Sequence, residues 1–219
     1  MKFLVFQFGF FEPVVVLWYI AVSLLFIIAA IFIIQAQKME LKSQKNVYRG
    51  YGLFSFFFGL TRFFFLLAFF EENMEIDYFY LMIGYLMGTL GVIVIIFILE
   101  TYLLKTKKIL TLISVILFVI ILISIMALAR EFALIMIYIL LPSSLIAGLS
   151  SYVYLIFKST GSSRKKALGA LLGLILILIG HFVNTTIFTT FVPNFPQLLS
   201  PIILSIGILV FGTSQLLIK

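Results

Sequence analysis

Three ionisable side chains lie inside long apolar stretches of the sequence and are its first candidates for chemistry: Arg62, Glu100 and His181. Arg62 is the most informative, because an arginine at the centre of a bilayer costs at least ~2.5–3.5 kcal/mol and normally faces other helices or water. It lies thirteen residues beyond Arg49, or ~20 Å further along a helix. The sequence therefore predicts a cation deep inside a membrane bundle.

The helical face that carries Arg62 indicates what surrounds it. Gly52, Ser55 and Gly59 share this face, and phenylalanines cover the rest of the segment. Small residues let neighbouring helices approach closely, so we expect Arg62 to point toward other helices. It then has either a structural role, snorkelling or donating hydrogen bonds to carbonyls, or a functional one, as the anchor for an anionic ligand or a buried carboxylate.

Glu100 shares one face of its predicted helix with Tyr85 and Thr89. It lies only five residues before Lys105, and so ~7 Å from the cytoplasmic edge, which is too shallow for a pair with Arg62. An ion pair with Arg49 or Lys105 is expected instead. A proton-coupling role for Glu100 is the alternative interpretation.

His181 is predicted at nearly the same depth as Arg62, fourteen residues into its own apolar segment. A lone histidine is either a hydrogen-bonding core residue or a ligand or proton relay. The predicted ligand-binding residues are the polar side chains of the outer half of the bundle: Arg62, Tyr85, Thr89, Tyr138, Ser143, His181, Asn184 and Ser205.

Catalysis, metal binding and cofactor chemistry are not expected. The chain has no cysteine and one histidine, too few ligands for a zinc site. Ser150 and His181 resemble the serine and histidine elements of rhomboid proteases, but their depths differ by ~10 Å, too far for a nucleophile–base pair. A retinal-binding rhodopsin is excluded because the last apolar segment contains no lysine.

The elements that must position these residues are apolar segments long enough to cross a membrane. Of the 219 residues 64% are hydrophobic and 11% are charged, which is too few charges for a soluble domain. Each segment has the ~20 residues that a spanning helix needs. The prediction is an all-α, single-domain bundle of seven transmembrane helices without a soluble domain, covering residues 13–36, 50–70, 78–104, 109–129, 132–157, 167–190 and 198–218.

Basic residues set the expected orientation. Twelve lysines and arginines fall in the loops after the first, third and fifth segments and at the C-terminus, whereas the other side carries only Lys2 and Arg130. Positive charge marks the cytoplasmic side, so the N-terminus is predicted outside and the C-terminus in the cytoplasm of a cell membrane. The net charge of +7 then indicates contact with anionic headgroups, not nucleic acid.

Glycines and prolines predict how the helices pack. Gly169, Gly173 and Gly180 form a close-packing seam on the sixth helix, and three glycines between residues 84 and 91 make the third helix a central one. The fourth helix has few polar side chains and is expected at the periphery, facing lipid. Pro142 should kink the fifth helix.

The helix count and orientation resemble those of seven-helix membrane sensor modules of prokaryotic signalling proteins, and that resemblance covers layout only. The leading hypothesis is a receptor-like sensor that acts through a cytoplasmic or membrane protein partner. A small-solute or ion transporter gated by the kinked fifth helix is the second hypothesis. A structural subunit whose glycine seam docks a partner helix is the third.

Overall fold

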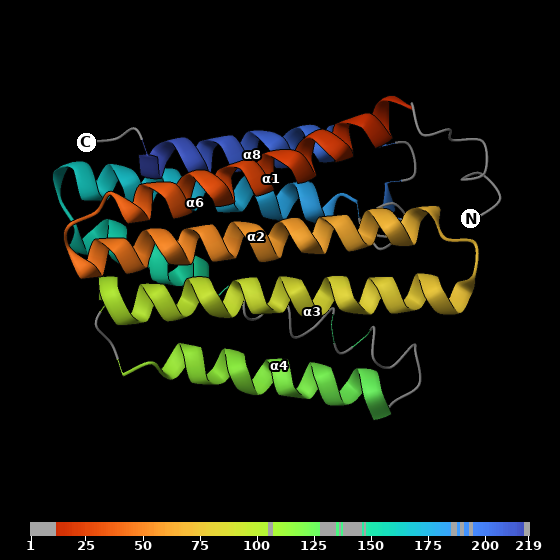
Figure 1. Cartoon of the computed structure of the whole chain (residues 1–219), viewed down its shortest axis with the longest axis horizontal. Helices are drawn as coiled ribbons and strands as arrows, with labels where there is room; N and C mark the ends of the chain where they lie inside the picture. Colours follow the sequence, from red (N-terminus) through yellow and green to blue (C-terminus); the bar gives the residue numbers. More distant parts are fainter. Residues whose placement is uncertain are drawn as a thin grey trace.

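The fold is a bundle of long helices that run nearly parallel or antiparallel to one another (Figure 1). The computed structural model describes residues 12–104, 107–127, 148–184 and 195–216, together with 135, 137, 146, 188, 191 and 192. Within this part of the chain no strand occurs. Its helices are α1 (Pro13–Gln37), α2 (Lys42–Phe70), α3 (Met74–Ile98), the π-helical η2 (Leu99–Leu104) that continues α3, α4 (Ile109–Ala127), α6 (Gly161–Phe182) and α8 (Leu199–Leu216).

Six helical stretches of the described residues are long and apolar enough to cross a membrane: α1, α2, α3 with η2, α4, α6 and α8. This confirms an all-helical architecture of the multi-pass membrane type. Of the predicted fifth helix, residues 148–157 are helical, while half of the segment, including Tyr138, Pro142 and Ser143, lies outside the described residues.

Contacts between neighbouring helices run in the order α6, α8, α1, α2, α3, α4. In Figure 1 α6 lies behind α1 and α8. α3 is the most buried spanning helix, with 56% of its apolar window inside the bundle, against 17% for α4. The high burial of α3 agrees with the prediction for the third helix, although α3 is next to last in this order, and the predicted peripheral position of the fourth helix is confirmed.

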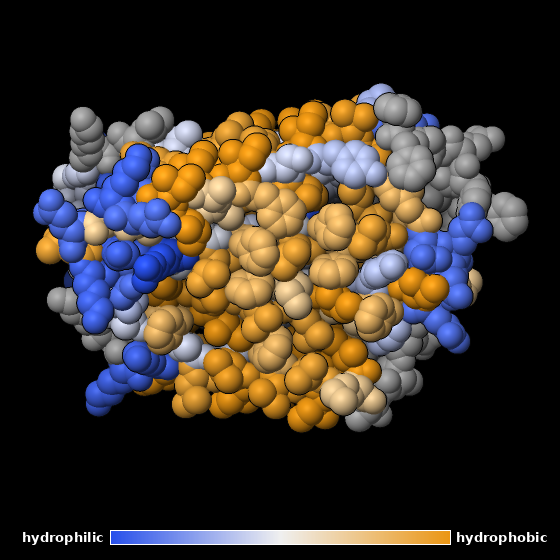
Figure 2. Space-filling view, viewed as in Figure 1, coloured by the Kyte–Doolittle hydropathy of each residue, from blue (hydrophilic) through white to orange (hydrophobic). Residues whose placement is uncertain are grey.

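The surface of the bundle has an apolar belt between two polar ends (Figure 2). One end, here called the basic end, contains the α1–α2 turn, the α3–α4 turn, the start of α6 and the end of α8. The opposite, acidic end contains the α2–α3 turn with Glu71, Glu72 and Glu75. The basic and acidic loops that alternate along the sequence therefore lie at opposite ends of one bundle.

Several helices extend beyond their predicted bounds. α2 begins at Lys42 instead of residue 50, and α6 begins at Gly161 instead of residue 167, because the hydrogen-bonded backbone continues through polar residues beyond the apolar run. At its other end α6 stops at Phe182, before the predicted residue 190. Val183 and Asn184 form a turn there, which agrees with the low helix propensity of asparagine and β-branched residues.

The predicted glycine seam of α6 is confirmed, and α8 of the same chain fills it. A Cβ added to Gly173 would lie 2.6 Å from the backbone nitrogen of Phe211, and one added to Gly180 would lie 2.7 Å from that of Leu204. Gly169 packs equally tightly against Ser214. This seam is therefore closed within the chain and is not open to a partner helix.

An aromatic cluster fills the core between the basic end and the level of Arg62. It consists of Phe32 of α1, Tyr51 and Phe54 of α2, and Phe211 of α8. The rings of Phe32, Tyr51 and Phe54 each lie within 5.5–6.0 Å of the Phe211 ring, mostly in edge-to-face geometry. These contacts join the first, second and last described helices.

Candidate ligand-binding site around Arg62

Arg62 points into the bundle, where only 2% of its surface is exposed. Its guanidinium carbon lies 4.9 Å from the ring centre of Trp18, 5.6 Å from Phe58 and 5.8 Å from Phe65. Phe58 and Phe65 are four residues before and three residues after Arg62 on α2, so they flank it on one helical face. Trp18 comes from α1. The arginine thus lies in an aromatic cage that stabilises its charge by cation–π contact.

Arg62 also contacts His181 in the last turn of α6. The guanidinium Nη2 donates a hydrogen bond to the imidazole Nδ1. An imidazole that accepts at Nδ1 is neutral and carries its proton on Nε2. The Phe65 ring stacks on the imidazole at 6.0 Å with an interplanar angle of 16°. The equal depth predicted for the two residues corresponds to a direct contact between α2 and α6.

The charge of Arg62 is only partly satisfied. The guanidinium Nε is buried and has no hydrogen-bond partner. Among the described residues no carboxylate lies within ion-pair distance of the guanidinium. The cage therefore holds a cation whose neighbours are three aromatic rings and a neutral imidazole, and it keeps one strong N–H donor unused.

The other predicted binding residues lie in different environments. Tyr85 is close, because its ring lies 4.9 Å from that of Phe65, which belongs to the aromatic cage. Thr89 is fully buried and donates its hydroxyl to the Tyr85 carbonyl at 2.9 Å, within α3. Asn184 is exposed in the turn after α6, and Ser205 is half-buried on α8. Tyr138 and Ser143 lie outside the described residues.

Glu100 has a structural role, as a helix cap that was not predicted. Its carboxylate, 1% exposed in η2, accepts hydrogen bonds from the backbone nitrogens of Leu110 at 3.1 Å and Thr111 at 2.7 Å, and from the Thr111 hydroxyl at 2.7 Å. Leu110 and Thr111 belong to the first turn of α4, whose N–H groups have no helical partner of their own. Glu100 therefore caps α4. The ion pair with exposed Arg49 or with Lys105, which lies outside the described residues, stays a prediction.

The aromatic cage was missed in the sequence. Phe58 and Phe65 could have been found from their spacing to Arg62, since residues three and four apart share a helical face. Trp18 gave a weaker signal, which is that it is the only tryptophan of the chain. Whether Trp18 contacts Arg62 depends on how α1 packs on α2, and this packing cannot be derived from the sequence of either segment alone.

Within the described residues no group of three or more acidic or histidine side chains could hold a metal ion. Comparison of the chain with protein-family models, curated proteins and solved structures finds no significant match.

Proposed function

We propose that the chain is a receptor-like membrane module in which Arg62 binds an anionic or hydrogen-bond-accepting ligand from the acidic end of the bundle. Positive charge marks the cytoplasmic side, so in this proposal the basic end and the C-terminus face the cytoplasm of a cell membrane and the N-terminus faces outward. The basic loops then meet anionic headgroups and a partner protein that carries the response.

The observation that supports this proposal is the buried, unused Nε–H of Arg62. A buried cation without an anion loses its hydration and gains no compensating ion pair. A ligand carboxylate would supply the missing acceptor, and a charge-assisted hydrogen bond of this kind contributes ~1.5–3 kcal/mol.

The walls of the site favour a ligand that is partly apolar. Trp18, Phe58 and Phe65 surround the guanidinium with rings. Binding sites for small amphiphiles combine such apolar walls with a few convergent polar groups. We therefore propose a ligand that combines one anionic group with a hydrocarbon body.

The contact with His181 provides a route from the site to the rest of the bundle. A ligand anion that takes hydrogen bonds from Arg62 competes with the imidazole, which sits at the end of α6. Because α6 is packed tightly on α8 through the glycine seam, a displacement of its end moves both helices together.

The single tryptophan makes the proposal testable by fluorescence, since Trp18 lies 4.9 Å from the guanidinium. Purified protein in uncharged detergent is titrated with decanoate and, separately, with uncharged decanol. We expect a saturable change in Trp18 emission with decanoate only, and at least a tenfold loss of apparent affinity in Arg62→Met. The matched control is Arg49→Met, which removes an exposed arginine of the same helix.

The proposal is wrong if decanol and decanoate give the same titration, or if Arg62→Met binds decanoate as well as the unchanged protein does.

The transporter hypothesis rests on the kink at Pro142. That residue lies outside the described part of the chain, so no described contact favours transport over binding.

A further inference from the structure

A second polar site lies at the basic end of the bundle, away from Arg62. It is a cavity of about 330 Å³ between the start of α2, η2, residues 148–158, the start of α6 and the end of α8. Four tyrosines from three parts of the chain line it, namely Tyr48, Tyr51, Tyr102 and Tyr152, together with Lys166 and Gln44. The aromatic cluster around Phe211 separates this cavity from the level of Arg62.

Two tyrosine hydroxyls on the walls of the cavity are available as hydrogen-bond donors, whereas that of Tyr48 already donates to the Gln215 carbonyl at 2.9 Å. The Tyr102 hydroxyl accepts a hydrogen bond from Asn46 at 2.9 Å, which leaves its own O–H free to donate. Tyr152 is 1% exposed, and its buried hydroxyl makes no hydrogen bond. This hydroxyl lies next to that of Tyr51.

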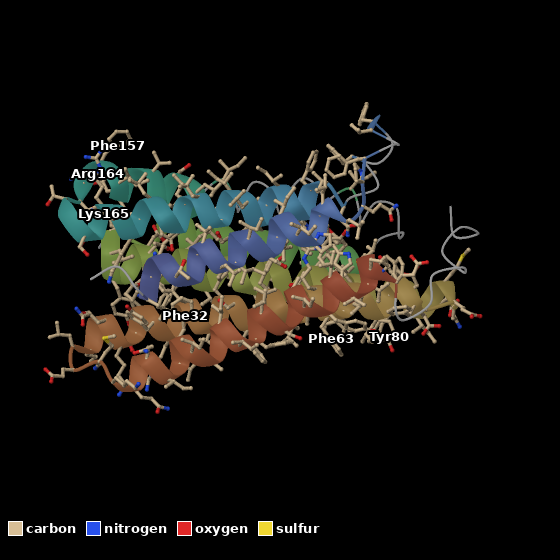
Figure 3. The ribbon with its side chains drawn as sticks, turned by 90° about the horizontal axis from the view of Figure 1, so that it is seen from above. Phe32, Phe63, Tyr80, Phe157, Arg164 and Lys165 are labelled. Carbon is tan, nitrogen blue, oxygen red and sulfur yellow. The ribbon has the colours of Figure 1, made fainter. Side chains whose placement is uncertain are left out.

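The charge of the cavity is positive. Lys166 is half-buried in its wall, and no carboxylate belongs to the residues that line it. Arg164 and Lys165 stand at the same end of the bundle, on the outside of α6 (Figure 3). Such a site attracts anions and offers them the lysine charge and the hydroxyl donors of Tyr102 and Tyr152.

We propose that this cavity binds an organic phosphate. A phosphate group has three strong acceptor oxygens, so it can accept hydrogen bonds from more donors than a carboxylate can. Lysine is a common phosphate ligand, acting as a point charge. The volume of the cavity is close to the lower limit of ~300 Å³ for small-molecule sites. It is larger than the volume that inorganic phosphate alone would fill. The organic part of the ester contacts the apolar walls formed by Leu103 and Leu155.

Two sources could present this chemistry, a soluble phosphate ester or the headgroup of an anionic phospholipid. The probes are glycerol 3-phosphate, added to protein in uncharged detergent, and phosphatidic acid, placed in phosphatidylcholine nanodiscs. The readout is the thermal unfolding midpoint as a function of probe concentration. A saturable rise with glycerol 3-phosphate indicates a soluble ester, and a rise confined to phosphatidic acid indicates a lipid headgroup; both support the site.

Adjacent lysines provide the matched control. Lys166→Gln removes the charge inside the cavity and should weaken the apparent affinity at least tenfold, whereas Lys165→Gln removes an exposed charge and should change it less than twofold. Lys166→Arg keeps the charge and should retain binding, which separates a charge effect from a folding defect. An equal loss in both glutamine variants would show non-specific attraction and would overturn the proposal.

A pair of tyrosines tests the hydroxyl donors. Tyr152→Phe removes the unpartnered hydroxyl and should weaken binding at least fivefold without lowering the unfolding midpoint of the ligand-free protein. Tyr154→Phe removes the hydroxyl of a tyrosine that is 47% exposed, and it should have no effect. The proposal is overturned if neither probe raises the midpoint, or if Tyr152→Phe binds as the unchanged protein does. Because Trp18 reports only on the Arg62 site, either site can fail without the other.

Discussion

Removing the carboxylate of Glu100 tests whether η2 holds the start of α4. Three hydrogen bonds end on this carboxylate, two from backbone nitrogens and one from the Thr111 hydroxyl. Each hydrogen bond to a charged group contributes ~1.5–3 kcal/mol when nothing replaces it. Near the membrane surface water can reach part of a freed helix end, so we expect Glu100→Ala to lower the free energy of unfolding by ~2–4 kcal/mol.

Glu100→Gln is the finer perturbation. The amide keeps one acceptor oxygen and its size, but it loses the negative charge that favours a helix N-terminus, and its NH₂ group faces donors. We expect a loss of ~1–2 kcal/mol. The measurement is denaturant-induced unfolding in detergent, and the control is Glu72→Gln, the same change at an exposed carboxylate, which should stay within ~0.5 kcal/mol of the unchanged protein.

A double-mutant cycle with Thr111→Val isolates the cap. If the carboxylate and the hydroxyl interact, Thr111→Val destabilises the unchanged protein by ~1 kcal/mol and has little effect once Glu100 is alanine. Full additivity of the two changes, or a Glu100→Ala protein that unfolds at the same denaturant concentration as the unchanged one, would refute the cap.

Two further changes test the packing and the turns of the bundle. Gly173→Ala should destabilise the protein by ~1–3 kcal/mol, because its methyl group would meet the Phe211 backbone; Gly148→Ala, whose methyl group would find its nearest neighbour at 3.8 Å, should be neutral in the same thermal unfolding assay. Asn73→Ala should cost ~1 kcal/mol, because the Asn73 side chain accepts a hydrogen bond from the Glu75 backbone nitrogen at 2.9 Å and caps α3; unchanged stability would show that solvent replaces this cap.

The sequence was sufficient for features that depend on one segment at a time. Length and apolarity identified the spanning helices, and glycine spacing identified the face of α6 that α8 covers. The depth of Arg62 and His181 followed from counting residues along two helices. These properties are local, so they can be derived without knowing how the helices are arranged.

Features that depend on the arrangement of several segments could not be predicted from the sequence. The cap on α4 requires η2 and the following turn to bring Glu100 back onto residues ten and eleven positions later. The cavity at the basic end requires tyrosines separated by more than a hundred residues to meet. Tyrosines near helix ends are common at membrane interfaces, so Tyr48, Tyr102 and Tyr152 gave no individual signal.

The length of α2 has a consequence for the surrounding lipid. α2 has 29 residues and reaches ~44 Å at 1.5 Å per residue, whereas a typical hydrocarbon layer is ~30 Å thick. The first turns of α2, at the basic end, carry Lys42, Lys45 and Arg49 and therefore extend beyond the apolar belt. In a bilayer these turns lie among the headgroups, where their side chains attract anionic lipids to this end of the bundle.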